Sequence, residues 1–374
     1  MQIDRLINID KIWDLQHEFE RNNGIKILNV SDWNCSRQFK DTLLDVFDSP
    51  TYNNFVEYIY SYSLSESIIE QLRNKYPFCK KNAREVMITP NNTVSIVYIA
   101  NLLKQLNLRK ICVIAPSYFS IYNALDVFNI NYDKLSLHRQ GNQFQIDSNI
   151  EWNRYDAIWL TSPVFCNGVS FDSEILDTIE RLSKEKIIIT DESFCQFGEE
   201  LPNKINLKNH IGIYSPHKGL GFNAFKFSLI SLNKEFMDIL EQWSDVLCGS
   251  LNTVNYDAIQ HFLSTNFNVC QKAYAQFINT SRKNICKLIE HNKNLSYDTN
   301  STGNMMMVYT SKYKNSDLCN DEFYKELMLN TRGCIFPGYL HDYDDSFGFC
   351  FRVNLSLYNE HFHNIFQNIC NYMK

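Results

Sequence analysis

The chain has 374 residues, of which 44% are hydrophobic and 14% aromatic. This composition is typical of a packed globular protein and excludes a disordered one. The formal net charge of −6 provides no basic surface for a nucleic-acid partner. No apolar run approaches the roughly 20 residues that span a bilayer, and the first residues lack the apolar core of a signal peptide. We therefore expect no nucleic-acid and no membrane partner.

The chain contains twelve cysteines, which show no CxxC pair and no short cluster of the kind that binds a metal ion. Without a secretion signal, such scattered cysteines indicate small buried side chains in a reducing compartment rather than disulfides. The sequence therefore predicts a cytoplasmic protein without a metal site.

Caps and hydrophobic spacing predict the elements of the N-terminal part. They are a helix over 10–21 that Gly24 ends, a strand over 25–30, and helices over 36–47 and 65–76. From about residue 85 strands and helices alternate. The expected strands are 85–89, 110–115, 156–161, 186–190, 211–215 and 225–231, and the expected helices are 93–105, 118–128 and 172–184. Long helices follow over 235–247, 254–263 and 274–291.

The predicted strand cores at 111–114 and 187–189 are continuously apolar. Such runs are typical of strands that are buried on both faces, as in a mostly parallel sheet covered by helices. We therefore expect an α/β fold with a large domain over 46–240. The first 45 residues together with 241–374 are expected to form a smaller α+β domain.

Lys218 follows one of these strands in a glycine-rich turn, in the run SPHKGLG at 215–221. A lysine amine held in a partly desolvated setting can form a Schiff base with an aldehyde. Other polar or turn-forming residues stand at the ends of the preceding strands: Thr89, Pro116, Ser162, Asp191 and Ser215. Because the carboxyl ends of parallel strands form the binding edge of such a sheet, we expect one site there.

Residues around these strand ends, and one residue farther along the chain, extend this site. Residues 91–93 open a helix directly after a strand, where backbone amides and the helix dipole attract an anion. Tyr118 follows a Pro-Ser turn at another strand end, and Asp191 follows an apolar strand. Arg352 lies on a short apolar strand, in the run FRVNLS at 351–356, and an arginine binds a carboxylate with two parallel hydrogen bonds.

In this order, the residues resemble the class I/II aminotransferase family, the fold type I enzymes of pyridoxal phosphate (PLP). The resemblance covers about 60–352 and depends on the order and strand-end placement of the motifs, since no single motif is complete. It implies an aspartate aminotransferase-like fold, PLP as cofactor, a small-molecule α-amino acid substrate and a homodimer.

The resemblance implies a role for each position. Lys218, in a Ser-x-x-Lys motif, corresponds to the Schiff-base lysine that also moves the substrate's α-proton, and Asp191 to the carboxylate against the pyridine nitrogen. Arg352 corresponds to the arginine that binds the substrate's α-carboxylate. The remaining cofactor contacts fall on Asn91, Asn92, Thr93, Ser215 and Lys226 for the phosphate, Tyr118 for stacking on the ring, and Tyr60 for the phosphate of the partner subunit.

The sequence departs from the family at two positions. In the family, the side chains at these positions donate hydrogen bonds to the phenolic oxygen of the cofactor. Phe194 stands where the family has a tyrosine, and Phe165 aligns with the asparagine of an Asn-Pro-x-Gly-like turn. Asn167, two residues farther on, is the candidate replacement. Without these donors the phenolate oxygen of the cofactor is less stabilised. The pKa of the aldimine between the cofactor and Lys218 is therefore expected to be higher.

The sequence thus favours a PLP-dependent aminotransferase acting through a Lys218 Schiff base. Elimination, replacement or cyclisation on the same scaffold is the first alternative, since these reactions begin with the same proton abstraction by Lys218. A non-catalytic cofactor-binding relative is the second, because of the missing phenolic-oxygen donors. A nucleotide-binding enzyme is disfavoured, because neither GxGxxG nor GxxxxGK[ST] follows a strand.

Overall fold

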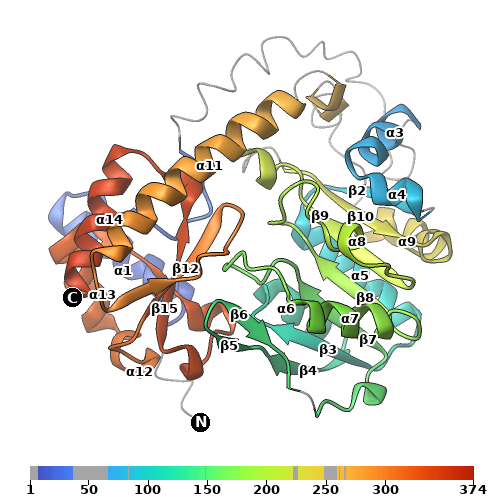
Figure 1. Cartoon of the computed structure of the whole chain (residues 1–374), viewed down its shortest axis with the longest axis horizontal. Helices are drawn as coiled ribbons and strands as arrows, with labels where there is room; N and C mark the ends of the chain where they lie inside the picture. The colour runs from blue at the N-terminus through green and yellow to red at the C-terminus, as the bar shows by residue number, and fades with distance from the viewer. Residues whose placement is uncertain are drawn as a thin grey trace.

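The computed structural model describes residues 7–36, 66–82, 84–147, 149–221, 226–247, 259–260, 262–264 and 267–374. Figure 1 shows two lobes, each built around a sheet, and the long helix α11 (Phe267–Glu290) extends from one lobe to the other. Helix α1 (Ile9–Asn23), near the start of the described chain, and the C-terminus lie on the same lobe, the one that contains strands β12 and β15. The N-terminal segment is therefore part of the lobe that the C-terminal third builds.

The larger lobe contains a seven-stranded sheet. Its strands, in spatial order, are β2 (Glu85–Thr89), β10 (Ser228–Leu232), β9 (His210–Tyr214), β8 (Ile187–Asp191), β7 (Ala157–Thr161), β3 (Lys110–Ala115) and β4 (Asn131–Ser136). β10 is antiparallel to both of its neighbours, and the other described pairs are parallel. The expected mostly parallel α/β sheet is confirmed.

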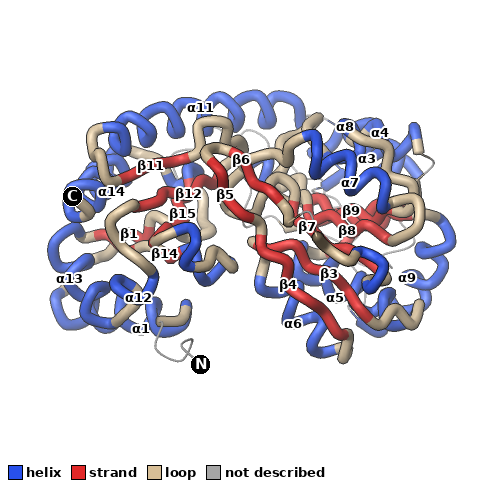
Figure 2. Tube along the Cα trace, turned by 60° about the horizontal axis from the view of Figure 1, so that its bottom comes forward, coloured by secondary structure: helices blue, strands red, loops and turns tan. Residues whose placement is uncertain are grey.

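Helices cover both faces of this sheet (Figure 2). One face packs against α5 (Asn92–Gln105), α6 (Phe119–Val127) and α9 (Lys234–Leu247), and the other against α7 (Ser173–Leu182) and α8 (Leu201–Lys204). Successive strand residues alternate between the two cores: Val113 and Trp159 face the first, and Ile114 and Ile158 the second. This alternation explains why the strands are apolar throughout their length.

The smaller lobe contains a four-stranded antiparallel sheet. Its strands are β11 (Leu295–Tyr297), β12 (Met305–Thr310), β15 (Phe349–Asn354) and β14 (Phe336–Pro337). The helices of this lobe are α1 (Ile9–Asn23), α12 (Asn315–Leu318), α13 (Asp321–Thr331) and α14 (Glu360–Tyr372). The N-terminal strand β1 (Leu28–Asn29) pairs in parallel with β13 (Gly333–Cys334). This pairing connects the N-terminal segment to the C-terminal part of the chain.

Shorter elements complete the described chain. They are helices α3 (Glu66–Lys75) and α4 (Pro77–Lys81), the hairpin β5 (His138–Gln140) and β6 (Gln143–Gln145), and 3-10 helices at Trp152–Arg154, Lys218–Leu220, Gly338–His341, Asp345–Phe347 and Leu355–Leu357. Within the described ranges no helix is both long and apolar enough to cross a membrane. In the same residues no group of three or more His, Cys, Asp or Glu side chains is placed to hold a metal ion.

Most expected elements occur within a few residues of their predicted bounds. The strand expected over 25–30 shortens to β1, because only two of its residues pair with β13. The helix expected from 274 begins earlier, at Phe267. The helix expected over 36–47 lies almost wholly outside the described residues, and that over 254–263 lies mostly outside them. The boundaries 46–240 for the large domain, and 1–45 plus 241–374 for the small one, stay a prediction.

A polar cluster connects the two lobes beside the β5–β6 hairpin. Asp298 is fully buried, and its carboxylate accepts hydrogen bonds from Arg139 at 2.9 Å and from Asn167 at 2.6 Å. The Arg139 guanidinium also covers the ring of Tyr309 at 4.0 Å. Next to Asn167, the Gly168 carbonyl accepts from the Thr302 amide at 2.8 Å. Both lobes thus contribute to one hydrogen-bonded contact.

This contact predicts that Gly168 is intolerant of a side chain. Its φ is +82°, and an added Cβ would overlap the Thr302 carbonyl oxygen. Gly141 has a similar φ of +63°, but nothing lies near its missing Cβ. We expect Gly168→Ala to lower the free energy of unfolding by about 3 kcal/mol and Gly141→Ala by about 1 kcal/mol. Denaturant unfolding checks this, and equal losses would show that the lobes do not meet at Gly168.

Candidate active site

A cavity of about 490 Å³ opens at the carboxyl ends of the parallel strands, where both lobes meet. Most of its lining comes from the loops after β2, β3, β7, β8 and β9, as expected for such a sheet. The smaller lobe adds residues from its N-terminal segment and from the start of β12. The lining residues are Trp33, Asn91, Asn92, Thr93, Val94, Tyr118, Phe165, Asp191, Phe194, His217, Lys218, Lys226, Asn304 and Met305.

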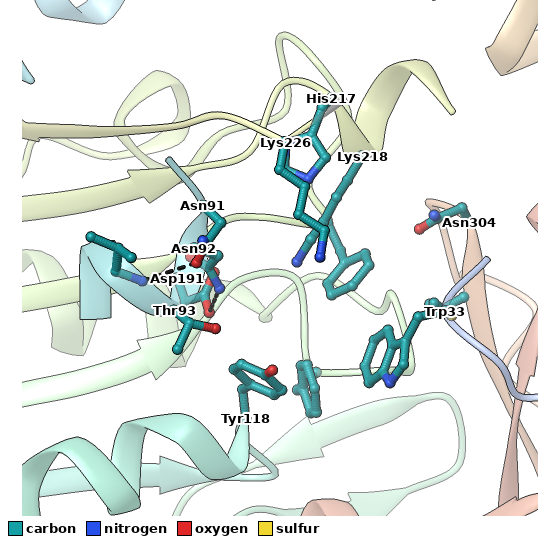
Figure 3. Close-up of a pocket in the computed structure, with 14 residues that line it drawn as sticks. Trp33, Asn91, Asn92, Thr93, Tyr118, Asp191, His217, Lys218, Lys226 and Asn304 are labelled. Atoms are coloured by element: carbon teal, nitrogen blue, oxygen red, sulfur yellow. Dashed lines mark hydrogen bonds between the residues drawn. The ribbon is translucent and has the colours of Figure 1, made fainter. Parts of the chain in front are cut away.

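Lys218 directs its amine into this cavity, as does Lys226 (Figure 3). Lys218 starts the short 3-10 helix after β9, and its Nζ lies 4.1 Å from the centroid of the Phe194 ring. Burial lowers the pKa of the Lys218 amine to about 8, because desolvation disfavours the ammonium more than the attraction of Asp191 favours it. About a tenth of the amine is therefore neutral, and nucleophilic, at pH 7, which is far more than at the ordinary lysine pKa.

Asp191 is the last residue of β8, and its carboxylate is only 2% exposed. One oxygen accepts from the side-chain amide of Asn92 at 3.1 Å, which Figure 3 marks, and the other from the Ser193 backbone amide at 3.1 Å. These two donors fix the orientation of the carboxylate at the cavity wall. The position suits a partner that carries a protonated ring nitrogen.

The N-terminus of helix α5 forms another part of the wall. Asn91 caps this helix, since its side chain accepts from the Val94 amide at 3.1 Å. The amides of Asn92 and Thr93 belong to the first turn, where they have no partner within the helix. Together with the helix dipole and the exposed Lys226, they form an arrangement that suits an anion.

Four aromatic rings line the opposite side. Tyr118 lies 5.8 Å from Phe165 and 6.2 Å from Trp33, and Phe194 lies 6.0 Å from Trp33, between ring centroids. Phe165 and Phe194 occupy the positions at which the family has hydrogen-bond donors. The structure brings both to the cavity, where neither can donate.

Three of the expected site residues that the structure describes do not line the cavity, namely Asn167, Ser215 and Arg352. The Asn167 side chain is fully buried and donates to Asp298 and Tyr309, so it connects the lobes rather than facing the site. The Ser215 hydroxyl bonds to those of Ser193 and Ser228 at 3.1 and 2.8 Å, behind the Lys218 turn. Tyr60 lies outside the described residues.

Arg352 is completely buried, close to the site but behind Trp33. Its Nε donates to the Ser31 carbonyl at 3.0 Å, its Nη2 donates to the same oxygen, and its Nη1 lies 3.2 Å from His341 Nε2. The centre of the guanidinium lies 3.5 Å from the Trp33 ring centroid. In this arrangement the guanidinium does not line the cavity, so its role as a carboxylate site stays a prediction.

Sequence patterns missed four lining residues, namely Val94 in the first turn of α5, and Trp33, Asn304 and Met305. The last three come from the smaller lobe, and only the docking of the lobes brings them to the strand ends. Asn304 donates to Tyr274 and Ser356, both at 3.1 Å, so its side chain is held at the cavity edge. Local periodicity carries no signal for such long-range contacts.

His217 also lines the cavity, beside Lys218. Its Nδ1 lies 2.6 Å from the Phe227 carbonyl oxygen, and burial together with the charge of Lys218 lowers its pKa to about 3. The imidazole is therefore neutral across the physiological range and adds no positive charge to the site.

Comparison with solved structures identifies the fold. A methionine aminotransferase from Escherichia coli, YbdL, superposes with a TM-score of 0.76 at 13% identity, over 97% of this chain and 96% of that one. N-succinyldiaminopimelate aminotransferase from Mycobacterium tuberculosis gives 0.75 at 13%, over 97% and 96%. A Thermus thermophilus aspartate aminotransferase double mutant gives 0.75 at 14%, over 96% of each.

The protein has the aspartate aminotransferase-like fold. The resemblance seen in the sequence is therefore confirmed at the level of the fold, over nearly the whole chain. No protein-family profile matches the sequence, and neither does any curated protein. Because the identities are low, the likeness shows the fold, and function has to be argued from the cavity.

The lowered pKa of Lys218 predicts its reactivity with an aldehyde. The neutral amine is the nucleophile, so the rate at which the protein forms a Schiff base with an added aldehyde such as PLP should rise with pH and level off above about pH 8. A lysine with the ordinary pKa of about 10.4 would give a rate that still rises at pH 10. Stopped-flow absorbance measures this profile, and Lys218→Ala is the blank for other lysines.

Proposed function

We propose that the protein is a PLP-dependent aminotransferase acting on an α-amino acid. The observation that carries this proposal is the joint placement of Lys218 and Asp191 in one cavity with the N-terminus of α5. These residues fit PLP: Lys218 suits its aldehyde, Asp191 its pyridine nitrogen, and the first-turn amides with Lys226 its phosphate. When bound, PLP withdraws electrons from the substrate's α-carbon.

Lys218 has two tasks in this proposal. Its amine would hold the cofactor, and the same amine would move the substrate's α-proton. A base works best when its pKa lies near the operating pH, and burial brings that of Lys218 down to about 8. The lysine can therefore both accept and return a proton without a second base, and neutral His217 is not needed.

Asp191 stabilises positive charge on the ring nitrogen. Asn92 and Ser193 orient its oxygens before substrate arrives, so the carboxylate does not have to reorganise during the reaction. Tyr118, Phe165 and Phe194 exclude water from the same space. Exclusion of water strengthens the interaction between Asp191 and its partner.

Transamination is favoured over the alternatives by the comparisons, since the similar solved structures include methionine, N-succinyldiaminopimelate and aspartate aminotransferases. Elimination, replacement and cyclisation share the first proton transfer by Lys218 and diverge afterwards. The non-catalytic alternative depends on the missing donors at Phe165 and Phe194. A non-catalytic protein would not need a lysine amine with a lowered pKa, whereas the pKa of Lys218 is lowered to about 8.

We further propose a homodimer in the cytoplasm, with the domain boundaries given above. The dimer and the roles of Tyr60, Ser215 and Arg352 are supported by the resemblance in sequence pattern. The cytoplasm is supported by the cysteines, which are free thiols throughout the described residues. Analytical ultracentrifugation of the purified protein tests the dimer.

The proposal predicts covalent attachment of PLP to Lys218. Borohydride reduction of the loaded protein and peptide mapping should find the label on Lys218, and an amino-acid substrate should then shift the absorbance of unreduced protein to that of the amine form of the cofactor. Lys218→Arg should keep the positive charge and lose both signals. Label on another lysine would overturn the site, and a label without any spectral shift would favour the non-catalytic alternative.

The placement of Asp191 predicts that two variants lose α-proton exchange to different extents. Asp191→Asn removes the negative charge, so α-proton exchange should slow by about 100-fold or more while PLP still binds. Asn92→Ala removes one of the two donors that orient the carboxylate, so the loss should be about tenfold. Exchange of the α-proton in deuterium oxide measures both. Near-normal exchange in Asp191→Asn would make this residue a structural cap of β8.

A further inference from the structure

Arg352 is a fully buried cation for which the described residues provide no negative partner. None of the ion pairs in the described chain includes its guanidinium. The negative charge of Asp32 acts on Arg352, but this carboxylate accepts from the Trp33 backbone amide at 2.7 Å and from the Asn34 side chain at 2.6 Å. A charge that is buried without an opposite charge is costly. The surroundings of Arg352 therefore suit an anion that arrives from outside the chain.

The groups that hold the Arg352 guanidinium are neutral. The Ser31 carbonyl accepts from Nε at 3.0 Å and also from Nη2, and His341 Nε2 lies 3.2 Å from Nη1. The sulfur of Cys166, which follows Phe165 of the cavity wall, lies 3.9 Å from Nη1. Burial raises the pKa of this thiol to about 11, so it carries no charge at neutral pH. These contacts therefore orient the guanidinium without cancelling its charge.

The contact with Arg352 determines where His341 carries its proton. A guanidinium has only donors, so Nε2 of His341 is the acceptor and the single proton of the imidazole is on Nδ1. This Nδ1 is buried and has no hydrogen-bond partner in the described chain. Burial and the charge of Arg352 hold the pKa of His341 well below its usual range, since a second cation would lie 3.2 Å from the first. His341 thus leaves one donor unpaired and remains a neutral acceptor.

The turn that carries His341 is anchored in the larger lobe by the two residues that follow. The Asp342 carboxylate accepts from the Tyr122 hydroxyl at 2.6 Å. The Tyr343 hydroxyl donates to the Phe165 carbonyl at 2.6 Å. The position of the imidazole against Arg352 is therefore set by contacts between the lobes, and not by the arginine alone.

Two hydrogens of the guanidinium have no oxygen or nitrogen partner in the described chain. A guanidinium has five N–H groups, of which Ser31 accepts those of Nε and one of Nη2, and His341 accepts one of Nη1. The second hydrogen of Nη2 and that of Nη1 on the Cys166 side remain. A carboxylate takes one hydrogen from each of two nitrogens, in the plane of the guanidinium. The Trp33 ring covers a face of the guanidinium and not this edge, so it does not compete with a carboxylate for these hydrogens.

We propose that His341 is a positioning residue for the α-carboxylate of the substrate. As a neutral acceptor it holds Arg352 so that two hydrogens and the whole positive charge of the guanidinium remain for that carboxylate. The proposal rests on the proposed function, in which Arg352 binds the α-carboxylate. His341→Glu would also hold the guanidinium, but it would cancel the charge. The difference between a neutral and a charged acceptor at residue 341 is therefore what an experiment has to measure.

The first experiment compares His341→Gln with His341→Glu in PLP-loaded protein. Both side chains have an oxygen that can accept from Arg352 Nη1, but only that of His341→Glu is charged. The ligands are the amino acid that gives the largest absorbance change among the twenty common ones, and its α-carboxamide. Absorbance titrations give both dissociation constants. The measure is the ratio of the two constants within each variant, which does not depend on how much protein is folded.

We expect the wild type to bind the acid at least about 30-fold more tightly than the amide, because the amide cannot form an ion pair with Arg352. The ratio should stay within about threefold in His341→Gln and fall by about tenfold or more in His341→Glu. The same two substitutions at His363, which lies in a separate cavity between α11 and α14, should leave the ratio unchanged. Equal ratios in His341→Gln and His341→Glu would overturn the inference.

A measurement without cofactor tests the proton position of His341. In protein labelled with ¹⁵N-histidine, the NMR signals that are absent from His341→Gln belong to His341, and their nitrogen shifts report which ring nitrogen carries the proton. We expect a neutral imidazole protonated at Nδ1 at about pH 7 and still at about pH 6, since burial beside Arg352 lowers its pKa. A proton on Nε2, or a charged ring at about pH 6, would overturn the inference whatever the protein catalyses.

The outcomes separate a failure of this inference from a failure of the proposed function. An acid and an amide that bind the wild type equally well would overturn the inference and the role of Arg352, and would leave the PLP site at Lys218 standing. No spectral response to any amino acid would overturn the proposed function, and this inference with it.

Discussion

The common direction of the strands is the constraint on which the site depends. β2, β3, β7, β8 and β9 run the same way, so their carboxyl ends meet at one edge of the sheet. Lys218, Asp191 and the cap of α5 are far apart in sequence, but each follows the end of a strand. The sheet therefore fixes their relative positions before any side-chain contact forms between them.

The smaller lobe closes the cavity at this edge of the sheet. The sheet supplies the charged groups, whereas Trp33, Asn304 and Met305 close the opposite side of the cavity. The cluster around Asp298 joins the lobes, and Asn167 is one of its members. A residue that the sequence pattern offered for cofactor binding thus serves to dock the lobe that closes the site.

The large sheet and the strand-end residues could be predicted from sequence because local signals specify them. Continuous apolar runs identify the buried strands, and Lys218 and Asp191 each stand within a few residues of the end of such a run. Asn167 and Arg352 were harder to place, since their surroundings depend on Asp298, Ser31 and other residues more than a hundred positions away. No local pattern reports a contact over that separation, and Trp33 escaped notice for the same reason.

Burial links the chemistry of Lys218 to the aromatic character of the cavity. Burial lowers the pKa of the Lys218 amine, and the Phe194 ring, whose centroid lies 4.1 Å from Nζ, is among the groups that surround it. A hydroxyl at residue 194 would stabilise a phenolate on the cofactor but would also bring a polar group next to the amine. Phe165 and Phe194 thus offer no donor to the cofactor that we propose, and they leave the Lys218 amine in apolar surroundings.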